Sequence, residues 1–440
     1  MSIKSRPEGG VRRIFANLGS LLAGKAGAGV MSLVYLVITA RALGAFDYGI
    51  LITVHGYATL VGGIVAFSGF HGIVRYGTDA LSSQDHHRFL RLFRFMTLVE
   101  LGCAAAAILV AMLLAPLVGP SLEWNADTIS FAAVYSFAIL ATVRSTPHGV
   151  LQIAGRFDLL GYHQLVAPAV RIVGAILVAA LGSGLYGFLL VWLIAALAEG
   201  VSMWIMGFAE MRRMGLPGGL LGPVKGARAE NAGLLPFIAT TNADTTLGEL
   251  APRAAPLIVG WVMGPVEAGL LSLAQRASVV IQQPSALLGQ ASFSVMTELA
   301  NEGRVAALKA SVRKSFTLVT AASVPVVLLL LVFADEVLSL LGGSSFEGGA
   351  MLLVLIAAAR GCTAGAPLLS SAITALGRPS LTISINLARS LGLLPLLPLF
   401  LMVFGLDGAG WHMIAQSLLY SVGLALILMR LDPQAKEPAS

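Results

Sequence analysis

The stretch from Phe93 to Val118 reads FRFMTLVELGCAAAAILVAMLLAPLV. It is longer than the roughly 20 apolar residues that an α-helix needs to cross a bilayer. The whole chain shares this character: hydrophobic residues fill 57% of its 440 positions, charged residues only 11%, and the mean hydropathy is +0.86. A soluble domain carries about 25% charged residues. Too few polar residues remain to cover a core in water, so lipid must be the outer solvent.

Apolar stretches of this kind recur along the whole sequence. They predict an all-α polytopic membrane protein with about twelve membrane-spanning helices and almost nothing outside the bilayer. Two pairs of neighbouring spans are expected to divide at Gly182–Gly184 and at Leu376–Pro379. The predicted spans are 14–40, 49–73, 93–118, 127–151, 161–182, 185–209, 233–263, 267–297, 312–333, 349–375, 380–402 and 405–429.

The Lys and Arg residues of the loops gather on one side of the predicted membrane. They lie before the first span, after each even-numbered span and near the end of the chain, whereas the opposite loops hold Arg41 alone. By the positive-inside rule we expect both termini in the cytoplasm, which requires an even number of spans. The net charge of +6 is therefore a topology signal, and it does not indicate nucleic-acid binding. Cys103 and Cys362 both fall inside spans and say little about the redox compartment.

The second half of the sequence repeats features of the first half at an offset of about 220 residues, which indicates an internal duplication. The matched features occupy equivalent places in the predicted topology. They are Gly44-Ala45-Phe46-Asp47-Tyr48-Gly49 with Gly264-Pro265-Val266-Glu267-Ala268-Gly269, Ala154-Gly155-Arg156 with Leu376-Gly377-Arg378, Thr78-Asp79-Ala80-Leu81 with Thr297-Glu298-Leu299-Ala300, and Arg171 with Arg389.

Six helices per repeat is an even number, so both halves begin on the same side of the membrane. This predicts two parallel six-helix lobes around a central cavity, with residues 1–210 in the first lobe and 233–440 in the second. Residues 211–232, which are rich in Arg, Gly and Pro, are predicted to be a cytoplasmic linker. Transporters with such symmetry bind the substrate between the lobes and expose it alternately to the two sides.

Charged side chains at bilayer depth cost at least ~2.5–3.5 kcal/mol each, so they normally face a wet cavity or a partner. Here most are cations, which favours a cavity that attracts an anionic ligand, because Arg forms bidentate contacts with phosphate. The alternative is structural: an Arg extends toward a helix end or pairs with a carboxylate such as Glu249 or Glu199. The cations are Lys25, Arg144, Arg171, Arg253, Arg276, Arg360 and Arg389, and the acids are Glu100, Glu199, Asp244 and Glu249.

The predicted seventh span carries a polar stripe of Asn242, Thr245, Thr246, Glu249 and Arg253, at the spacing of one helix face. We expect this stripe to face the space between the lobes, with Asp244 on the opposite side of the helix. Glu249 and Asp244 are candidates for carrying a coupling proton or sodium ion, or equally for pairing with a cation.

The sequence shows no sign of catalysis. It has no paired carboxylates, nucleophile motif or Cys/His cluster with metal-ligand spacing, and its loops are too short to house a catalytic domain. We therefore predict neither an enzyme nor a metal or cofactor.

Three motifs resemble those of the Wzx-type polysaccharide flippases, a family within the multidrug/oligosaccharidyl-lipid/polysaccharide exporter superfamily. Residues 40–49 resemble the A-R-x-L-G-x-x-x-Y-G that follows the first helix of those proteins. Residues 264–276 resemble G-x-x-x-x-G-x-Y-x-x-A-x-[KR], except that this chain has Leu or Ser where the tyrosine is usual. Residues 375–378 resemble the A-L-G-[RK] turn after the tenth helix.

The resemblance implies two six-helix bundles and transport of an undecaprenyl-diphosphate-linked oligosaccharide, such as an O-antigen or exopolysaccharide unit, across the bacterial inner membrane. Arg276 and Arg41 match motif positions. Of the two, Arg276 is the better candidate for substrate contact, because the place of Arg41 is also that of an anchor at a periplasmic helix end. Arg41 and Arg253 are candidates for gating or ion pairing. The implied partners are the lipid-linked substrate and membrane lipid, with a polysaccharide polymerase and glycosyltransferases as further candidates, and no nucleic acid. Burial of charge at membrane depth, rather than the resemblance, adds the other cations to Arg276, so the candidate substrate ligands are Lys25, Arg144, Arg171, Arg276, Arg360 and Arg389.

Several alternatives compete with this interpretation. A cation-coupled drug or metabolite antiporter of the same superfamily would suit an acidic cavity better than the cationic one expected here. A flippase for peptidoglycan precursors usually has more than twelve helices. A major-facilitator transporter would carry a G-x-x-x-D-[RK]-x-G-R motif, which residues 76–94 lack, and a glycan polymerase or ligase would have a large periplasmic loop.

Overall fold

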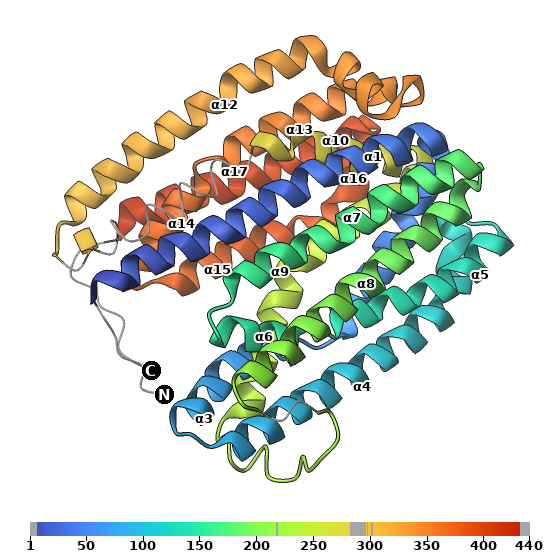
Figure 1. Cartoon of the computed structure of the whole chain (residues 1–440). Coiled ribbons are helices and arrows are strands. Elements are labelled where there is room, and N and C mark those ends of the chain that lie inside the picture. The colour runs from blue at the N-terminus through green and yellow to red at the C-terminus, as the bar shows by residue number, and fades with distance from the viewer. Residues whose placement is uncertain (1–6, 217–218, 282–295, 297, 301, 432–440) are drawn as a thin grey trace. The chain divides into compact units, whose positions relative to one another are not determined.

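A computed structural model describes residues 7–216, 219–281, 296, 298–300 and 302–431 (Figure 1). The described chain is helical, and most of its elements follow one another closely, except for the longer connection between Arg213 and Leu234. In chain order they are α1 (Pro7–Val65), α2 (Phe70–Gly72), η1 (Ile73–Gly77), α3 (Thr78–Ser82), α4 (His86–Val118), η2 (Gly119–Leu122), α5 (Ala126–Tyr135), η3 (Ser136–Thr142), α6 (Ser145–Ile153), α7 (Phe157–Leu181), α8 (Gly184–Arg213), α9 (Leu234–Met263), α10 (Pro265–Ala277), η4 (Ser278–Ile281), α12 (Val305–Gly342), η5 (Ser344–Gly349), α13 (Ala350–Thr363), α14 (Ala366–Ala375), α15 (Pro379–Leu387), η6 (Ala388–Gly392), η7 (Leu394–Leu396), α16 (Leu397–Phe404) and α17 (Asp407–Arg430).

Within the described residues, nine helical segments are long and apolar enough to cross a membrane. The first of them, Leu21–Val65, covers most of the predicted spans 14–40 and 49–73, which are separated by an interruption of α1 at Gly44, where φ is 72° and ψ is 176°. The second of these predicted spans is not one continuous helix, because α1 ends at Val65 and residues 66–69 are not helical. The predicted seventh span is α9, which carries Pro252 and Pro256 inside the helix. The eighth begins with α10 and extends into residues 282–295, outside the described part. The all-α polytopic fold is confirmed, and the divisions predicted at 182–184 and 376–379 coincide with helix ends.

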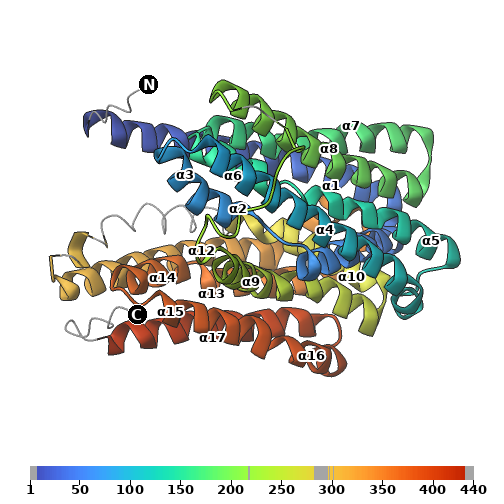
Figure 2. The same cartoon turned by 90° about the horizontal axis from the view of Figure 1, so that it is seen from below.

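The structure divides into two compact units. The first contains residues 1–43 and 54–246, and the second contains residues 44–53 and 247–440. In the first unit, α7 packs along α8 (Figure 2). Helix α8 also contacts η3 and α6. Its largest described core cluster surrounds Phe89, Phe93 and Met96 of α4.

In the second unit, α13 packs along both α17 and α12 (Figure 1). A core cluster joins α12, α14 and α17 through residues that include Leu308, Leu369 and Leu424. The other faces of α12 are apolar but largely exposed, which is the arrangement of a helix that contacts lipid.

The repeat seen in the sequence is also present in the backbone. Gly264, at the junction of α9 and α10, has φ 113° and ψ 175°, close to the conformation of Gly44. Positive φ with extended ψ is a region that essentially only glycine occupies. Gly155 and Gly377 likewise share positive φ values of 70° and 80°, and each closes the helix that precedes it. Equivalent turns therefore recur in both halves.

Arg156 follows one of these turns and forms ion pairs with two acids. Its guanidinium lies 2.7 Å from a carboxylate oxygen of Asp158 and 2.7 Å from one of Glu210. The hydrogen bond to Asp158 is the largest cause that raises the pKa of Arg156 above its ordinary value. This basic turn is thus fixed to the end of α8.

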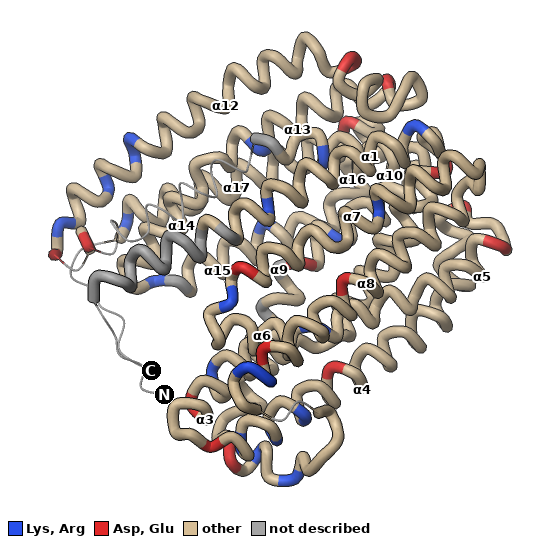
Figure 3. The backbone as a smooth tube through the Cα atoms, in the orientation of Figure 1, with Lys and Arg blue, Asp and Glu red and all other residues tan. Residues whose placement is uncertain are grey.

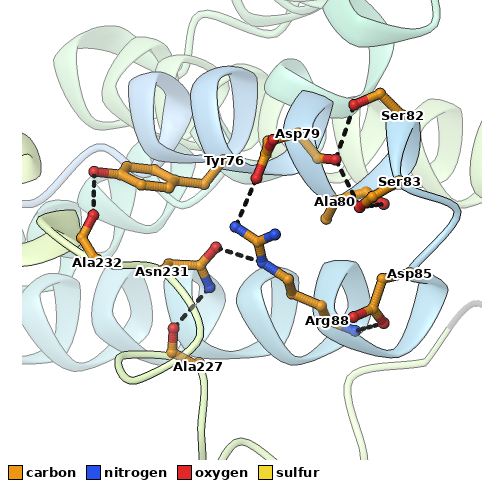
Figure 4. A network of polar contacts seen from close by, with 10 residues as sticks. All are labelled: Tyr76, Asp79, Ala80, Ser82, Ser83, Asp85, Arg88, Ala227, Asn231 and Ala232. Carbon is orange, nitrogen blue, oxygen red and sulfur yellow. Dashed lines mark hydrogen bonds and ion pairs between the residues drawn. The ribbon is translucent and has the colours of Figure 1, made fainter.

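Part of the predicted linker is attached to the start of α4 (Figure 4). Arg88 donates from Nε to the side-chain oxygen of Asn231 at 3.1 Å and pairs with Asp79 at 2.8 Å. Asn231 is fully buried and donates to the carbonyl of Ala227. Arg91, which lies one turn after Arg88 on α4, donates to both carboxylate oxygens of Glu230, each at 2.8 Å.

Two further hydrogen bonds hold the ends of residues 219–232. At one end, the hydroxyl of Tyr76 donates to the carbonyl of Ala232 at 3.1 Å. Arg94 donates to the carbonyl of Gly219 at the other end of the segment. Residues 219–232 are therefore attached at both ends to the rest of the first unit, and α9 begins immediately afterwards at Leu234.

Candidate functional site

The second unit contains a cavity of about 290 Å³ that brings together two of the predicted cations, Arg360 and Arg389. The cavity lies among α9, α10, α13, η6 and α17. Its lining combines polar and apolar side chains. The lining residues are Ala251, Pro252, Ala255, Leu271, Gln275, Arg360, Thr363, Arg389, Ser390, Leu394, Leu397, Ala409, His412, Met413, Gln416 and Ser417.

Arg360 is positioned by the end of α10 and the turn that follows it. Its Nε donates to the hydroxyl of Ser278 at 2.7 Å, and Nη2 donates to the carbonyl of Gln275 at 2.9 Å. Both of these partners are neutral oxygen atoms, and they hold the guanidinium in place at the cavity.

Arg389 is positioned by the aromatic ring of Tyr420. Its guanidinium carbon lies 4.1 Å from the centre of the Tyr420 ring, and Nε donates to the side-chain oxygen of Asn386 at 2.9 Å. Stacking on an aromatic face leaves the edge of a planar guanidinium available for hydrogen bonds. Arg389 lies in the π-helical segment η6, and such segments are frequent at functional sites.

His412 completes the polar part of the lining. Its side chain is buried, and the Nε2 atom bonds to the carbonyl of Leu393 at 2.8 Å. No carboxylate occurs among the described residues that line the cavity. Two guanidinium groups, two glutamine amides and several hydroxyls therefore face this space, which suits an oxyanion such as phosphate.

Two cations of the first unit, Arg144 and Arg171, have partners on neighbouring helices. Arg144 forms an ion pair with Glu199 at 2.6 Å, which matches the structural alternative considered for this residue. Arg171 donates to the hydroxyl of Tyr35 at 2.9 Å, and its guanidinium carbon lies 4.3 Å from the centre of the Trp192 ring. Arg171 and Arg389, which the repeat relates, thus both stack on aromatic rings.

The remaining predicted site residues are dispersed. Lys25 and Arg41 are exposed on α1, and Arg276 is half-buried in the last turn of α10, next to the cavity-lining Gln275. Arg253 pairs with Glu249 one turn earlier on α9, at 3.6 Å, again as the structural alternative described. The side chain of Asp244 lies outside the described residues.

The polar stripe of α9 contacts an irregular segment in the first unit. The side-chain amide of Asn242 bonds to both the N–H and the carbonyl of Ser68, at 2.7 and 3.0 Å. Ser68 belongs to residues 66–69, where the helical path is interrupted between α1 and α2. Asn242 therefore satisfies backbone groups that the interruption leaves without helical partners.

Glu100 is a buried acid that sequence analysis noted without assigning it a role. Its side chain is 1% exposed, and Oε1 accepts from the N–H of Gly69 at 2.7 Å and from the hydroxyl of Thr146 at 2.8 Å. Gly69 ends the interruption after α1, and Thr146 lies in the first turn of α6, after a second interruption at Val143 and Arg144. Glu100 thus joins two breaks in the helices of the first unit.

Comparison with known families gives one extensive match. The model of a family described as "Polysaccharide biosynthesis protein" matches residues 38–350. Among curated proteins, the chain is 25% identical over 293 residues to "Inner membrane protein YghQ" of Escherichia coli (strain K12), covering 66% of this chain and 82% of that protein.

Solved structures share the fold at low sequence identity. The lipid II flippase MurJ, in an inward closed conformation, aligns with a TM-score of 0.70 and 11% identity, over 92% of this chain and 86% of the other. An inward-facing transporter of the multidrug resistance MATE family aligns with a TM-score of 0.69 and 14% identity, over 91% and 94%. A MOP-superfamily transporter from Pyrococcus furiosus, described as having a binding pocket of reverse polarity, aligns at 0.58 with 14% identity, over 93% of each chain.

Proposed function

Since this chain belongs to the polysaccharide biosynthesis protein family and has the fold of membrane transporters and flippases, we propose that it translocates an undecaprenyl-diphosphate-linked oligosaccharide. Transport would run from the cytoplasmic to the periplasmic leaflet of the bacterial inner membrane by alternating access. The relative named as an inner membrane protein supports this location, and the basic loops support cytoplasmic termini. We further propose that the product supplies a polysaccharide polymerase and that glycosyltransferases build the substrate.

The observation that carries the proposal is the cavity that Arg360 and Arg389 share. A diphosphate must cross a slab of low dielectric constant, where an isolated charge is costly, and fixed guanidinium groups lower that cost. At about 290 Å³, the cavity is at the small end of ligand pockets, which run from ~300 to 1,000 Å³. It therefore fits the diphosphate group rather than the whole oligosaccharide.

A cation-coupled antiporter of the same superfamily is the competing function. Such a protein expels organic cations, which a carboxylate-lined cavity would attract. The lining of this cavity, among the residues described, contains two arginines and no acid. The polarity of the site therefore favours an anionic substrate.

The test is to deplete the protein in its native host and to measure the lipid-linked oligosaccharide in each leaflet of the inner membrane. We expect accumulation in the cytoplasmic leaflet, reversed by the wild-type protein and by Arg304→Gln, a basic control residue outside the cavity. Arg360→Gln at equal expression should not reverse it. No leaflet imbalance, with polysaccharide export intact, would reject the flippase and favour the antiporter.

A further inference from the structure

A second hollow of the second unit lies on a lipid-facing helix rather than in the Arg360 cavity. It has a volume of about 450 Å³ and lies where the first turns of α12 pack against α14 and α17. Its walls are mainly apolar and include Phe316, Leu369 and Leu428, and its basic lining residues are Lys309 and Arg313. A neighbouring hollow continues along α12 from Arg313 and Lys314 to Ala321. We refer to the two together as the α12 groove.

Lys309, Arg313 and Lys314 lie in two successive turns near the start of α12, and Figure 3 shows basic residues gathered at this end of the helix. Lys309 is held in place, because its Nζ donates to the carbonyls of Met429 and Leu431 at the end of α17. Arg313 and Lys314 are exposed. No carboxylate lies within ion-pair distance of these three cations in the part of the chain that the structure describes.

The dimensions match one leaflet of a bilayer. From Lys309 to Ala321 the groove follows α12 for roughly 18 Å at the helical rise per residue. The hydrocarbon of a single leaflet is about 15 Å deep. Beyond the groove, α12 continues with exposed apolar residues such as Leu328 and Val332, so this side of the helix faces lipid. The cations therefore lie at headgroup depth and the apolar walls lie at the depth of one acyl chain.

We propose that the α12 groove binds an anionic phospholipid of the surrounding membrane, with its phosphate on Arg313 and Lys314 and one acyl chain against Phe316 and Leu369. Basic clusters at the ends of transmembrane helices bind acidic headgroups in this manner. A phospholipid fits better than the proposed substrate, because an undecaprenyl chain is much longer than the groove. The site is separate from the Arg360 cavity and does not depend on the proposed transport activity.

The test uses the purified full-length protein in nanodiscs or mixed micelles, with native mass spectrometry to count retained lipids. We expect the wild-type protein to retain phosphatidylglycerol in preference to phosphatidylcholine. The double variant Arg313→Gln/Lys314→Gln should weaken phosphatidylglycerol binding about 30-fold, given the contribution of each basic residue near an acidic surface. Ala310→Phe should also reduce binding while all three cations remain, because Ala310 lines both hollows.

Arg304→Gln is the matched control, since Arg304 immediately precedes α12 but pairs with Glu302 and does not line the groove. It should bind lipid as the wild type does. Equal retention by the wild type and the double variant would overturn the proposal, and so would equal loss with Arg304→Gln. Displacement of phosphatidylglycerol by an equimolar polyprenyl diphosphate would assign the groove to the substrate instead.

Discussion

Gly49 lies directly against the backbone carbonyl of Pro265, so a side chain at position 49 would collide with that carbonyl. The repeat-related contact also exists: a β-carbon built on Gly269 would lie 2.8 Å from the carbonyl oxygen of Ala45. The two Gly-x-x-acid-x-Gly motifs thus pack against each other reciprocally within the second unit. The second glycine of each motif is required by close packing, whereas the first is required by its backbone conformation.

Gly49→Ala is therefore expected to destabilise the protein by about 1–3 kcal/mol, the usual cost of overpacking. Thermal unfolding in detergent measures this effect as a lower midpoint temperature. Gly29→Ala is the control, because Gly29 is also helical but a β-carbon there meets nothing within 4 Å. Equal midpoints for Gly49→Ala and Gly29→Ala would contradict the close contact.

Tyr420 is expected to act through the stacked guanidinium of Arg389. Tyr420→Ala removes the ring and should weaken binding of an anionic ligand about 10-fold, because the cation–π contact that orients Arg389 is lost. Tyr420→Phe keeps the ring and should retain affinity. The affinity of the purified protein for inorganic diphosphate, followed by calorimetry, distinguishes the two variants. Identical affinities would show that the stack does not position Arg389.

The Arg144–Glu199 pair is expected to be structural. Glu199→Gln leaves a partly buried guanidinium without its carboxylate and should cost about 1–3 kcal/mol, less than for a fully buried pair because both side chains are partly exposed. The double variant Arg144→Gln/Glu199→Gln should recover much of the loss. The free energy of unfolding is measured for Glu199→Gln, Arg144→Gln and the double variant. If the loss in the double variant equals the sum of the two single losses, the residues do not interact.

Arg91 is expected to hold the linker on α4. Arg91→Ala removes the bidentate contact with Glu230, so residues 219–232 should open more often. Trypsin cleavage after Lys225 and Arg228 should then be several-fold faster, as measured by limited proteolysis and mass spectrometry. Arg304→Ala should leave the cleavage rate unchanged. An unchanged rate in Arg91→Ala would mean that other contacts hold this segment.

The membrane helices could be predicted from the sequence because length and apolarity are properties of each segment alone. The paired motifs could also be predicted, since Gly44 and Gly264 adopt a conformation that restricts the residue type. The interruptions near Ser68 and Arg144 could not, because they depend on partners such as Asn242 and Glu100 on other helices. Periodicity within one segment carries no information about such partners.

The candidate site was predictable only as a set of buried charges. The sequence identifies Arg360 and Arg389 as cations at membrane depth, but it does not show that they share one cavity. It likewise cannot decide that Arg144 pairs with Glu199, since the two are on different helices. His412 carried no signal, because an isolated histidine without metal-ligand spacing is more often a hydrogen-bonded core residue.

The attachment of residues 219–232 has a mechanical consequence. Residues 219–232 are not a flexible linker, because Ala232 is hydrogen-bonded to Tyr76 and α9 begins two residues later. The boundary between the two units falls after Thr246, inside α9 itself. Pro252 and Pro256 follow this boundary. Each lacks a backbone N–H group and so removes one hydrogen bond of the helix, which makes the helix easier to bend there. We therefore expect any bending of the chain at this boundary to occur within α9, next to Pro252 and Pro256.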